Sequence, residues 1–377
     1  MSSRLLAALM SATTAVAFSF PAAAIEAEAA AQALATALAG GSNAKVTFDS
    51  AAQAGPNIVI QGLSVADTQG DGTVRFNETI IESPTEGGAG IFDTPRITFN
   101  GGTVGGESTG SIGNAALTQV TVLDPGAVAG EAPGKGVLFQ TAEANDLRLS
   151  RKAEPGELTA ARVFMEVTNV VDNVPQDSKG VVEDVTVPPE FFAGAQFSPQ
   201  TLGYENLVFD VTWDGSRDIG AKTLTVRDFT ISIQDGGELS FTGKMGNLPE
   251  PTALNDADAP AQATSVEVHT ITMRYEEASL AGRILDWMAQ QQGISRADYA
   301  NQISAALPFL LAAVNNPEFQ NELAGAVGAF LKDPRSLTLK IEPAAPITGE
   351  EIMSIAGSAP QTLPDRLNAT VTANTPD

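Results

Sequence analysis

Residues 207–248 decide the fold class of this chain, and they read LVFDVTWDGSRDIGAKTLTVRDFTISIQDGGELSFTGKMGNL. Large apolar residues stand at every second position of the first run: Leu207, Phe209, Val211 and Trp213. Successive side chains of a β-strand point to opposite faces, so these four residues would share one face. We therefore expect a strand whose large apolar side chains are gathered on one side.

Two turn signals divide the rest of this stretch. We expect the Asp214-Gly215 pair to turn the chain first, and residues 235–237, which read Asp-Gly-Gly, to turn it again. Between them the alternation changes phase near Arg227-Asp228, which indicates a β-bulge. The stretch therefore predicts an antiparallel meander of three strands, with one face packed and the other in water.

The same texture extends over residues 45–275, which are rich in Val, Ile, Thr and Phe and interrupted by Gly, Asn, Asp and Pro. Runs such as 117–122 and 163–167 alternate with a period of two, as strands do. Residues 26–38 are rich in Ala and end at Gly40-Gly41, a pattern that predicts one opening helix.

Residues 276–333 change to a helical period and predict three amphipathic helices. Ser295 and Asp298 form a capping pair for the second helix, and Asn316-Pro317 is a typical start for the third. Alternation returns at 337–341 and 367–373, with a short helix expected at 347–356. We expect the C-terminal strands to rejoin the sheet.

These patterns predict an α+β fold that is mostly β, with a long, twisted antiparallel β-sheet, an N-terminal helix and a C-terminal three-helix block. We expect the helix and sheet in residues 25–275, the helical block in 276–333, and the returning strands in 334–377. Residues 248–264 contain Pro249, Pro251 and Pro260 and predict a loop.

Residues 1–24 have the order of parts of a secretory signal peptide. Arg4 supplies the positive charge, residues 5–20 are uncharged and mostly apolar, and residues 22–24 are a small-residue cleavage site. The alternative is a membrane anchor, but a run of about 16 residues is shorter than the roughly 20 that a span needs. We expect cleavage after Ala24, a periplasmic location, and no transmembrane segment in the mature chain.

Composition narrows the classes of function. The chain has no Cys, which excludes disulfides, a thiolate metal site and a Cys nucleophile. Its formal net charge is −24, which opposes binding to nucleic acid. Such acidity keeps an exported protein soluble; the alternative is an affinity for cations or cationic partners.

Catalytic motifs are absent from the sequence, and we assign no catalytic residue. The single histidine, His269, stands in an alternating strand between Val268 and Thr270, where a bystander role is expected. Acid pairs such as Glu205 with Asp210, or Glu276 with Glu277, could serve a glycosidase. Because the chain is so acidic, the alternative is that these residues are ordinary surface carboxylates exposed to solvent.

One stretch resembles a calcium loop. Asp67, Asp71, Gly72 and Glu78 occupy the first, fifth, sixth and twelfth positions of the EF-hand pattern, but Gln69 stands where Asp or Asn is preferred. The flanking residues read as strands, whereas an EF-hand needs helices. A hairpin turn explains the same residues, so the calcium site remains the alternative.

A sheet with one apolar face could curl into a groove that holds an acyl chain or an extended strand. Alternatively, helices fill that face completely. We expect a non-enzymatic envelope protein, either structural or binding an apolar or extended ligand, with a lipid or another envelope protein as its partner. The alternatives are a carboxylate-dependent hydrolase and an acidic calcium-binding protein.

Several segments together resemble a group of uncharacterised exported proteins of alphaproteobacteria. They are residues 213–218, 275–280, 285–293, 329–337, 356–360 and 363–374. The resemblance extends over most of the mature chain. It implies a location in the cell envelope, and it brings no activity, ligand or functional residue with it.

Overall fold

The computed structural model describes residues 25–40, 43–87, 91–127, 136–152, 154–171, 174–195, 198–249 and 264–376. The expected signal peptide and nearly all of the expected loop at 248–264 lie outside these residues. The chain forms two compact units, which divide between Phe191 and Phe192. Unit 1 precedes this point and unit 2 follows it.

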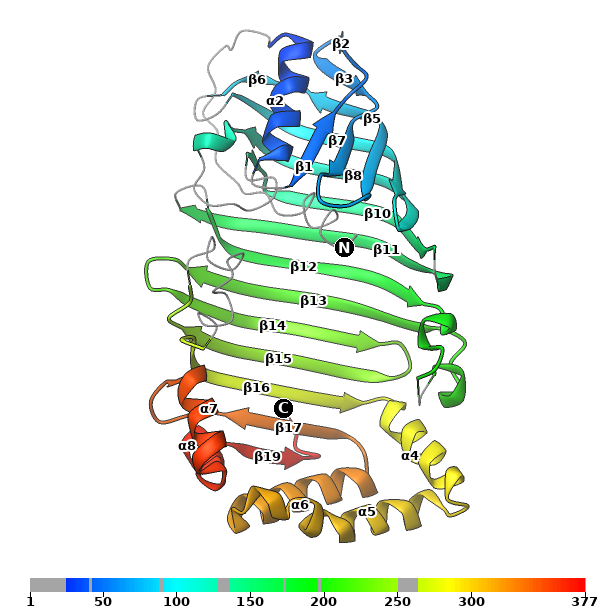
Figure 1. Cartoon of the computed structure of the whole chain (residues 1–377), viewed down its shortest axis with the longest axis vertical. Coiled ribbons are helices and arrows are strands. Elements are labelled where there is room, and N and C mark those ends of the chain that lie inside the picture. The colour runs from blue at the N-terminus through cyan, green and yellow to red at the C-terminus, as the bar shows by residue number, and fades with distance from the viewer. Residues whose placement is uncertain are drawn as a thin grey trace. The chain divides into compact units, whose positions relative to one another are not determined.

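The described part of unit 1 contains helix α2 and an antiparallel sheet (Figure 1). The long strands pair in the order β5, β7, β8, β10, β11, β12. The elements are α2 (Ala27–Ala39), β1 (Ala44–Thr47), β2 (Ser50–Ala54), β3 (Asn57–Gln61), β4 (Ser64–Asp67), β5 (Thr73–Glu82), β6 (Thr85–Glu86), β7 (Phe92–Gly105), β8 (Ser108–Val122), β9 (Val137–Leu138), β10 (Thr141–Arg151), β11 (Glu154–Val171) and β12 (Val174–Val187), with short 3-10 turns at Pro125–Ala127 and Pro189–Phe192.

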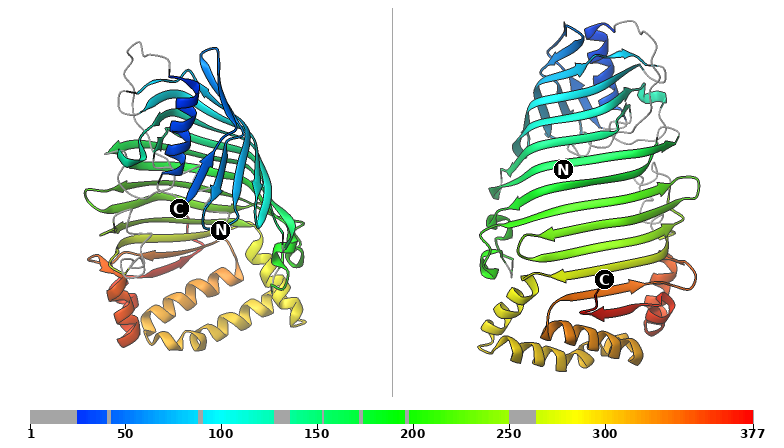
Figure 2. Two further views of the ribbon diagram at one scale, coloured as in Figure 1. Left: turned by 45° about the horizontal axis from the view of Figure 1, so that its top comes forward. Right: turned by 180° about the vertical axis from the view of Figure 1, so that it is seen from behind.

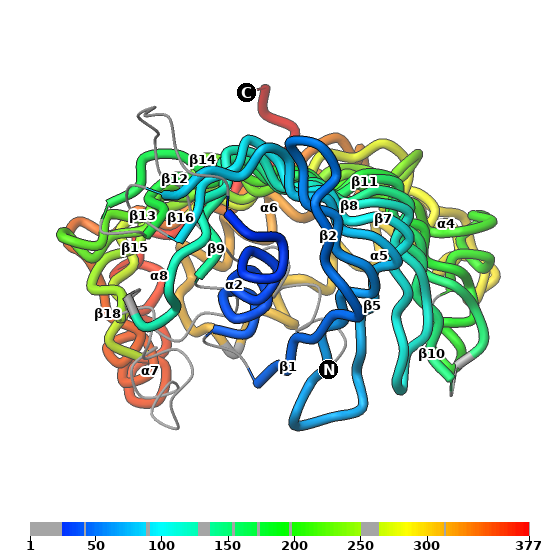
Figure 3. The backbone as a smooth tube through the Cα atoms, turned by 90° about the horizontal axis from the view of Figure 1, so that it is seen from above, coloured from blue at the N-terminus to red at the C-terminus, as the bar shows by residue number. Residues whose placement is uncertain are grey.

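Helix α2 covers the apolar face of the first strands of unit 1. It contacts β1, β2, β3, β8 and β9, and Figure 3 shows it lying between β9 and β1. Its side chains Ala30 and Leu34 are fully buried, together with Phe76 and Phe99 of the strands, whose ring centroids are 5.1 Å apart. The small Ala residues let the helix approach the sheet closely, so the part of the apolar face that α2 covers is packed and closed to solvent.

The opposite face of β10–β12 carries a row of cross-strand charge pairs. Arg162 of β11 donates to Glu143 of β10 over 2.7 Å and to Glu183 of β12 over 3.3 Å. Its guanidinium also lies 4.7 Å from the ring centroid of Phe164. Opposite charges on neighbouring strands fix the pairing register on the solvent side.

Unit 2 consists of a second antiparallel meander and its helices (Figures 1 and 2). The strands pair in the order β13, β14, β15, β16, β17, β19, with β18 beside the end of β16. The elements are β13 (Leu207–Asp218), β14 (Thr223–Ile233), β15 (Gly237–Gly246), β16 (Glu267–Glu277), α4 (Leu280–Gln291), α5 (Arg296–Leu310), α6 (Pro317–Lys332), β17 (Ser336–Ile341), β18 (Ile347–Thr348), α7 (Gly349–Ser358), α8 (Leu363–Leu367) and β19 (Thr370–Ala373), with 3-10 turns at Gln200–Leu202, Ala312–Val314 and Pro360–Thr362.

The predicted meander is confirmed, with one correction. The Asp214-Gly215 pair does not turn the chain: β13 continues through it to Asp218, and the turn lies at residues 219–222. The pair instead forms a bulge in the register with β14, where a Cβ on Gly215 would lie 3.1 Å from the Thr225 carbonyl oxygen. Turns and bulges both use Asp-Gly, so the letters alone do not separate them. The bulge predicted near Arg227-Asp228 is confirmed as a register shift between Val226 and Phe229.

The three-helix block is also confirmed. The Ser295 hydroxyl accepts from the Asp298 N–H over 3.1 Å, and the Asn316 side chain accepts from the Phe319 N–H over 3.1 Å, as the capping patterns predict. Helix α6 packs on β17 and β19, while α5 packs on α4 and α6. None of the helices in the described part of the chain is long and apolar enough to cross a membrane.

The C-terminal strands return to the sheet as predicted. Strand β17 pairs with β16 on one side and with β19 on the other. Helix α7 occupies most of the region expected to be a short helix, whereas α8, of five residues, is not predicted by the sequence pattern. With an N-terminal helix, antiparallel strands in both units and C-terminal helices, the chain is α+β and mostly β.

The packing of α2 can be tested with Leu34→Ala. Truncating a fully buried leucine costs about 2–5 kcal/mol, so the urea transition of unit 1 should move to a lower concentration. Gln32→Ala, on the exposed side of the same helix, is the control and should leave the transition within about 0.5 kcal/mol of wild type. Equal stability of the two variants would contradict the packed helix.

Candidate functional site

The apolar face of the unit 2 sheet is the candidate site, and a row of residues crosses it. Each member of this row is the direct cross-strand partner of the next: Trp213, Phe229, Phe241, Met273, Leu339 and Val371, from β13, β14, β15, β16, β17 and β19. We call these six residues the apolar row. A residue directly opposite another in a sheet lies on the same face, so all six share one face of the meander.

A second row runs beside the first on the same face. It consists of Val211, Ile231, Leu239, Tyr275, Leu337 and Ala373. The opposite face is polar, as the partners Thr212 and Thr230, or Ser240 and Arg274, illustrate. The sheet is therefore strongly two-sided.

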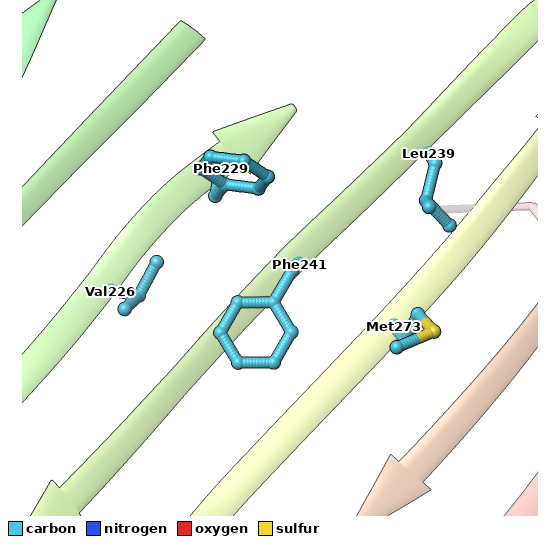
Figure 4. Close-up of a pocket in the computed structure, with 5 residues that line it drawn as sticks. All are labelled: Val226, Phe229, Leu239, Phe241 and Met273. Carbon is cyan, nitrogen blue, oxygen red and sulfur yellow. The ribbon is translucent and has the colours of Figure 1, made fainter. Parts of the chain in front are cut away.

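An apolar hollow lies on this face between β14, β15 and β16. Val226, Phe229, Leu239, Phe241 and Met273 line a space of about 440 Å³. Figure 4 shows their side chains gathered over the three strands. Phe229 and Leu239 are each 39% exposed and Met273 is 41% exposed, so the hollow is open to solvent. This grouping of exposed apolar side chains makes the hollow the candidate binding site of unit 2.

The apolar faces of the two units differ in how far their side chains are buried. In unit 1, α2 buries the face to the point that Phe76 and Phe99 have no exposure. In unit 2, no apolar side chain of the described strands β13–β16 is buried. Helix α6 covers the far end of the unit 2 rows, where the rings of Phe330 and Tyr275 meet edge to face at 5.9 Å between centroids.

Gly243 leaves room for the ring of Phe241, one of the residues that line the hollow. It is the cross-strand partner of Val226, and a Cβ built on it would lie 2.9 Å from the Thr270 carbonyl oxygen and 3.3 Å from the Phe241 Cζ. The Phe241 ring therefore leans over the glycine. Glycine inside a strand often marks a place where another group approaches the backbone closely.

The predicted acid pairs lie outside the lining of the apolar hollow. The carboxylate of Glu276 accepts from the Arg274 Nε over 2.8 Å. Asp210 lies on the polar face opposite Ser232, and Glu205 lies in the segment before β13. These acids therefore lie in the strands of the sheet or in the segment before β13, and they are not gathered around the apolar hollow.

Glu277 joins the sheet to the helical block. Its carboxylate accepts from the backbone N–H groups of Ala281 and Gly282, each over 2.9 Å, and from the Tyr275 hydroxyl over 2.5 Å. The first turn of α4 has free N–H groups that a carboxylate stabilises. Sequence reasoning missed this role because it depends on the angle at which α4 leaves β16.

His269 lies in β16 with its Nε2 3.6 Å from a carboxylate oxygen of Glu267. This is an ion pair only when the imidazole is protonated, and the side chain is 29% exposed. The histidine faces the backbone near Gly246 at the end of β15. The arrangement includes no hydroxyl nucleophile among its described contacts.

The residues of the calcium-loop pattern form the β4–β5 hairpin. The Asp67 carboxylate accepts from the Gln69 N–H over 2.8 Å, and the Asp71 carboxylate accepts from the Glu107 N–H over 3.2 Å. Glu78 lies well along β5, where it accepts from Asn100 over 3.2 Å. At about 3.3 Å per residue, Glu78 is roughly 16 Å along the strand from Thr73.

No group of three or more His, Asp or Glu side chains that could hold a metal ion occurs in the part of the chain that the structure describes. The hairpin brings Asp67 and Gln69 together in a local turn and leaves Glu78 apart from them. The geometry of this hairpin is that of a turn, and it adds no support to the calcium alternative.

Comparison with known proteins gives a match without an activity. A family model described as "Uncharacterized protein" matches residues 230–374, which include Leu239, Phe241 and Met273 of the hollow. A search of curated proteins finds no match. The chain is therefore similar, from the end of β14 to β19, to a family of unknown function.

The contact between Tyr275 and Glu277 predicts a pH effect. Burial and the hydrogen bond to Glu277 raise the pKa of Tyr275 above the ordinary value of about 10. Tyr275 then keeps its proton in the folded state when the unfolded chain loses it, so stability should fall as the pH rises above about 10. Tyr275→Phe should reduce that loss.

The chain has three Tyr residues, which makes the measurement direct. The difference between the 295 nm alkaline titrations of wild type and Tyr275→Phe isolates the ionisation of Tyr275. That ionisation should occur above pH 10 in the folded protein and near pH 10 in urea. A difference curve centred at or below pH 10 without urea would contradict the buried contact.

Proposed function

We propose that the apolar face of unit 2 binds the hydrocarbon part of a lipid, and that the protein is a non-enzymatic lipid-binding component of the bacterial envelope. The observation that supports this most is the open apolar row, whose central members Phe229 and Met273 are 39% and 41% exposed. An occupant that removes these side chains from water gains about 25 cal/mol for each Å² of apolar surface buried.

The size of the face favours an extended hydrocarbon chain. The apolar row crosses six strands, a span of about 24 Å at roughly 4.8 Å per strand. One leaflet of a bilayer is about 15 Å of hydrocarbon, half of a core of roughly 30 Å. From β13 to β16, the part that α6 leaves uncovered, the row spans about 14 Å, which is close to the hydrocarbon thickness of one leaflet.

The position of the hollow favours lipid over an added peptide strand. A peptide that extends a sheet binds its edge, where free N–H and C=O groups await a partner. The hollow lies in the middle of a face, over β14, β15 and β16, whose backbone groups pair with one another. All five lining side chains are apolar, so a hydrocarbon chain in the hollow would contact apolar side chains.

The carboxylates also favour a non-enzymatic role. Glu276 pairs with Arg274, and Glu277 caps α4 and accepts from Tyr275. Neither lines the hollow. A hydrolase acting on a ligand of this face would need its catalytic carboxylates beside that ligand. Glu276 and Glu277 instead form structural contacts away from the hollow.

The sequence at the N-terminus supports the cellular location in this proposal. Residues 1–24 have the pattern of a cleaved secretory signal, and the chain resembles exported proteins of alphaproteobacteria of unknown function. Export would deliver the protein to the periplasm, between two lipid bilayers. A protein that shields acyl chains from water has an evident use in that compartment.

Export can be tested by mass spectrometry. When the full gene is expressed in an alphaproteobacterial host, the protein in the periplasmic fraction should begin at Ile25. Cleavage requires small residues before the cut, so Ala22→Arg with Ala24→Arg should leave uncleaved protein with the membranes. Full-length protein beginning at Met1 in the cytoplasmic fraction of the wild type would contradict export.

Lipid binding can be tested with neighbouring residues of β15 that face opposite sides. Phe241→Asp places a carboxylate in the hollow and should weaken binding of a fluorescent fatty acid about tenfold or more, because a buried charge costs free energy. Thr242→Asp adds the same charge to an exposed position on the polar face and should bind as wild type does.

Native mass spectrometry of protein purified from its own periplasm provides the second measurement. The wild type and Thr242→Asp should carry co-purified lipid, and Phe241→Asp should not. Circular dichroism and the urea transition check that both variants fold. The proposal would be overturned if the two folded variants bound the fluorescent fatty acid with equal affinity. It would also be overturned if the wild type carried no lipid and did not bind the fluorescent fatty acid.

A further inference from the structure

The most exposed large apolar residues in the described part of the chain lie at the end of helix α5. Phe309 is 84% exposed and Leu310 is 67% exposed, and the two are adjacent in sequence. They do not line the hollow of the sheet. Helix α5 packs on α4 and α6, at the helical end of unit 2 (Figure 1). We call Phe309 and Leu310 the apolar tip.

The tip is held in place by hydrogen bonds on its C-terminal side. The Leu311 N–H donates to the Leu307 carbonyl over 2.9 Å, and the Gln320 side chain donates to the Leu311 carbonyl over 2.5 Å. Asn316, which is buried, caps α6 and donates to the Gln361 carbonyl over 3.0 Å. The exposed side chains therefore stand on an anchored backbone, and their exposure is built into the fold.

The sequence around the tip is free of charge. Residues 299–317 contain no Asp, Glu, Lys or Arg, in a chain that is 18% charged and has a net charge of −24. Met353 makes the contrast: it is 56% exposed on α7, but Glu350 and Glu351 stand beside it. A carboxylate opposes entry into a membrane, both through its desolvation and through repulsion by anionic headgroups. The two side chains of the tip carry no charge, so their insertion meets no such desolvation barrier.

The small area of the tip decides between a membrane and a protein partner. An aromatic side chain buries about 150–250 Å², so two apolar side chains offer a few hundred Å² at most. A stable protein interface needs about 800 Å² on each partner. Insertion into the headgroup boundary of a bilayer needs no complementary surface, and a few apolar side chains give reversible binding.

We propose that Phe309 and Leu310 insert into the surface of a lipid bilayer and dock unit 2 on it. This docking surface is separate from the lipid-binding hollow, and either one could operate without the other. Since the chain is strongly acidic, the docking is driven by apolar insertion alone. Uncharged, zwitterionic membranes are the preferred partners, and added anionic lipid weakens the contact at low salt.

The test is flotation of the mature protein with phosphatidylcholine vesicles. The wild type should float with the vesicles, and the double variant Phe309→Asp with Leu310→Asp should lose about tenfold or more in partition coefficient. Met353→Asp is the matched control, because it adds a charge at an exposed apolar residue outside the tip, and it should float as the wild type does.

The same samples separate docking from the hollow. The double variant should keep its affinity for the soluble fluorescent fatty acid, and Phe241→Asp should keep its flotation. Wild type that stays unbound with phosphatidylcholine, or folded double variant that floats equally well, would overturn membrane docking. A tip substitution that changes the oligomeric mass without changing flotation would overturn it in favour of a protein contact.

Discussion

The register of the unit 2 meander is the constraint on which its candidate site depends. Phe229, Phe241 and Met273 form one row because each is the direct partner of the next across neighbouring strands. A slip of one residue in the pairing of a strand would move all of its large apolar side chains to the polar face. The bulges at Asp214/Gly215 and Val226/Phe229 keep this alignment, since each absorbs a residue that would otherwise shift the phase along the strand.

Unit 1 shows what the same pattern gives when a helix covers it. Its strands also alternate apolar and polar residues, but α2 packs Ala30 and Leu34 against them and leaves Phe76 fully buried. In unit 2, helix α6 packs at the β19 end of the meander, and its Phe330 ring contacts the ring of Tyr275. The difference between a core and an open apolar face is therefore the placement of helices, while the strand pattern is common to both.

Much of this fold could be predicted from the sequence, because local patterns determine it. Alternation identified the strands, and the side chains of Ser295 and Asn316 located two helix starts through hydrogen bonds between close neighbours. The Asp214-Gly215 prediction was wrong because Asp-Gly occurs in bulges as well as in turns. What separates them is the partner strand, which lies farther along the chain.

The candidate site could be predicted only in part, for the same reason. The alternation predicted an apolar face for the meander and placed Trp213 on that face of its own strand. Which residue stands beside which depends on registers set across long connections, such as the one between β15 and β16 or the helices between β16 and β17. No two-residue turn fixes these registers. The role of Glu277 was hidden too, since it requires the start of α4 to lie over the end of β16.

An open apolar face carries a risk of aggregation, and the rest of the chain offsets it. The face is bordered on its reverse side by threonines and charged residues, such as Thr272 and Arg274 of β16, and the whole molecule carries a net charge of −24. Two copies that approached face to face would bring both sets of negative charge together, which opposes association. A neutral hydrocarbon chain meets no such repulsion. Under the proposed lipid binding, the strong acidity would oppose association of two copies through their apolar faces and would leave the hollow accessible to an uncharged apolar chain.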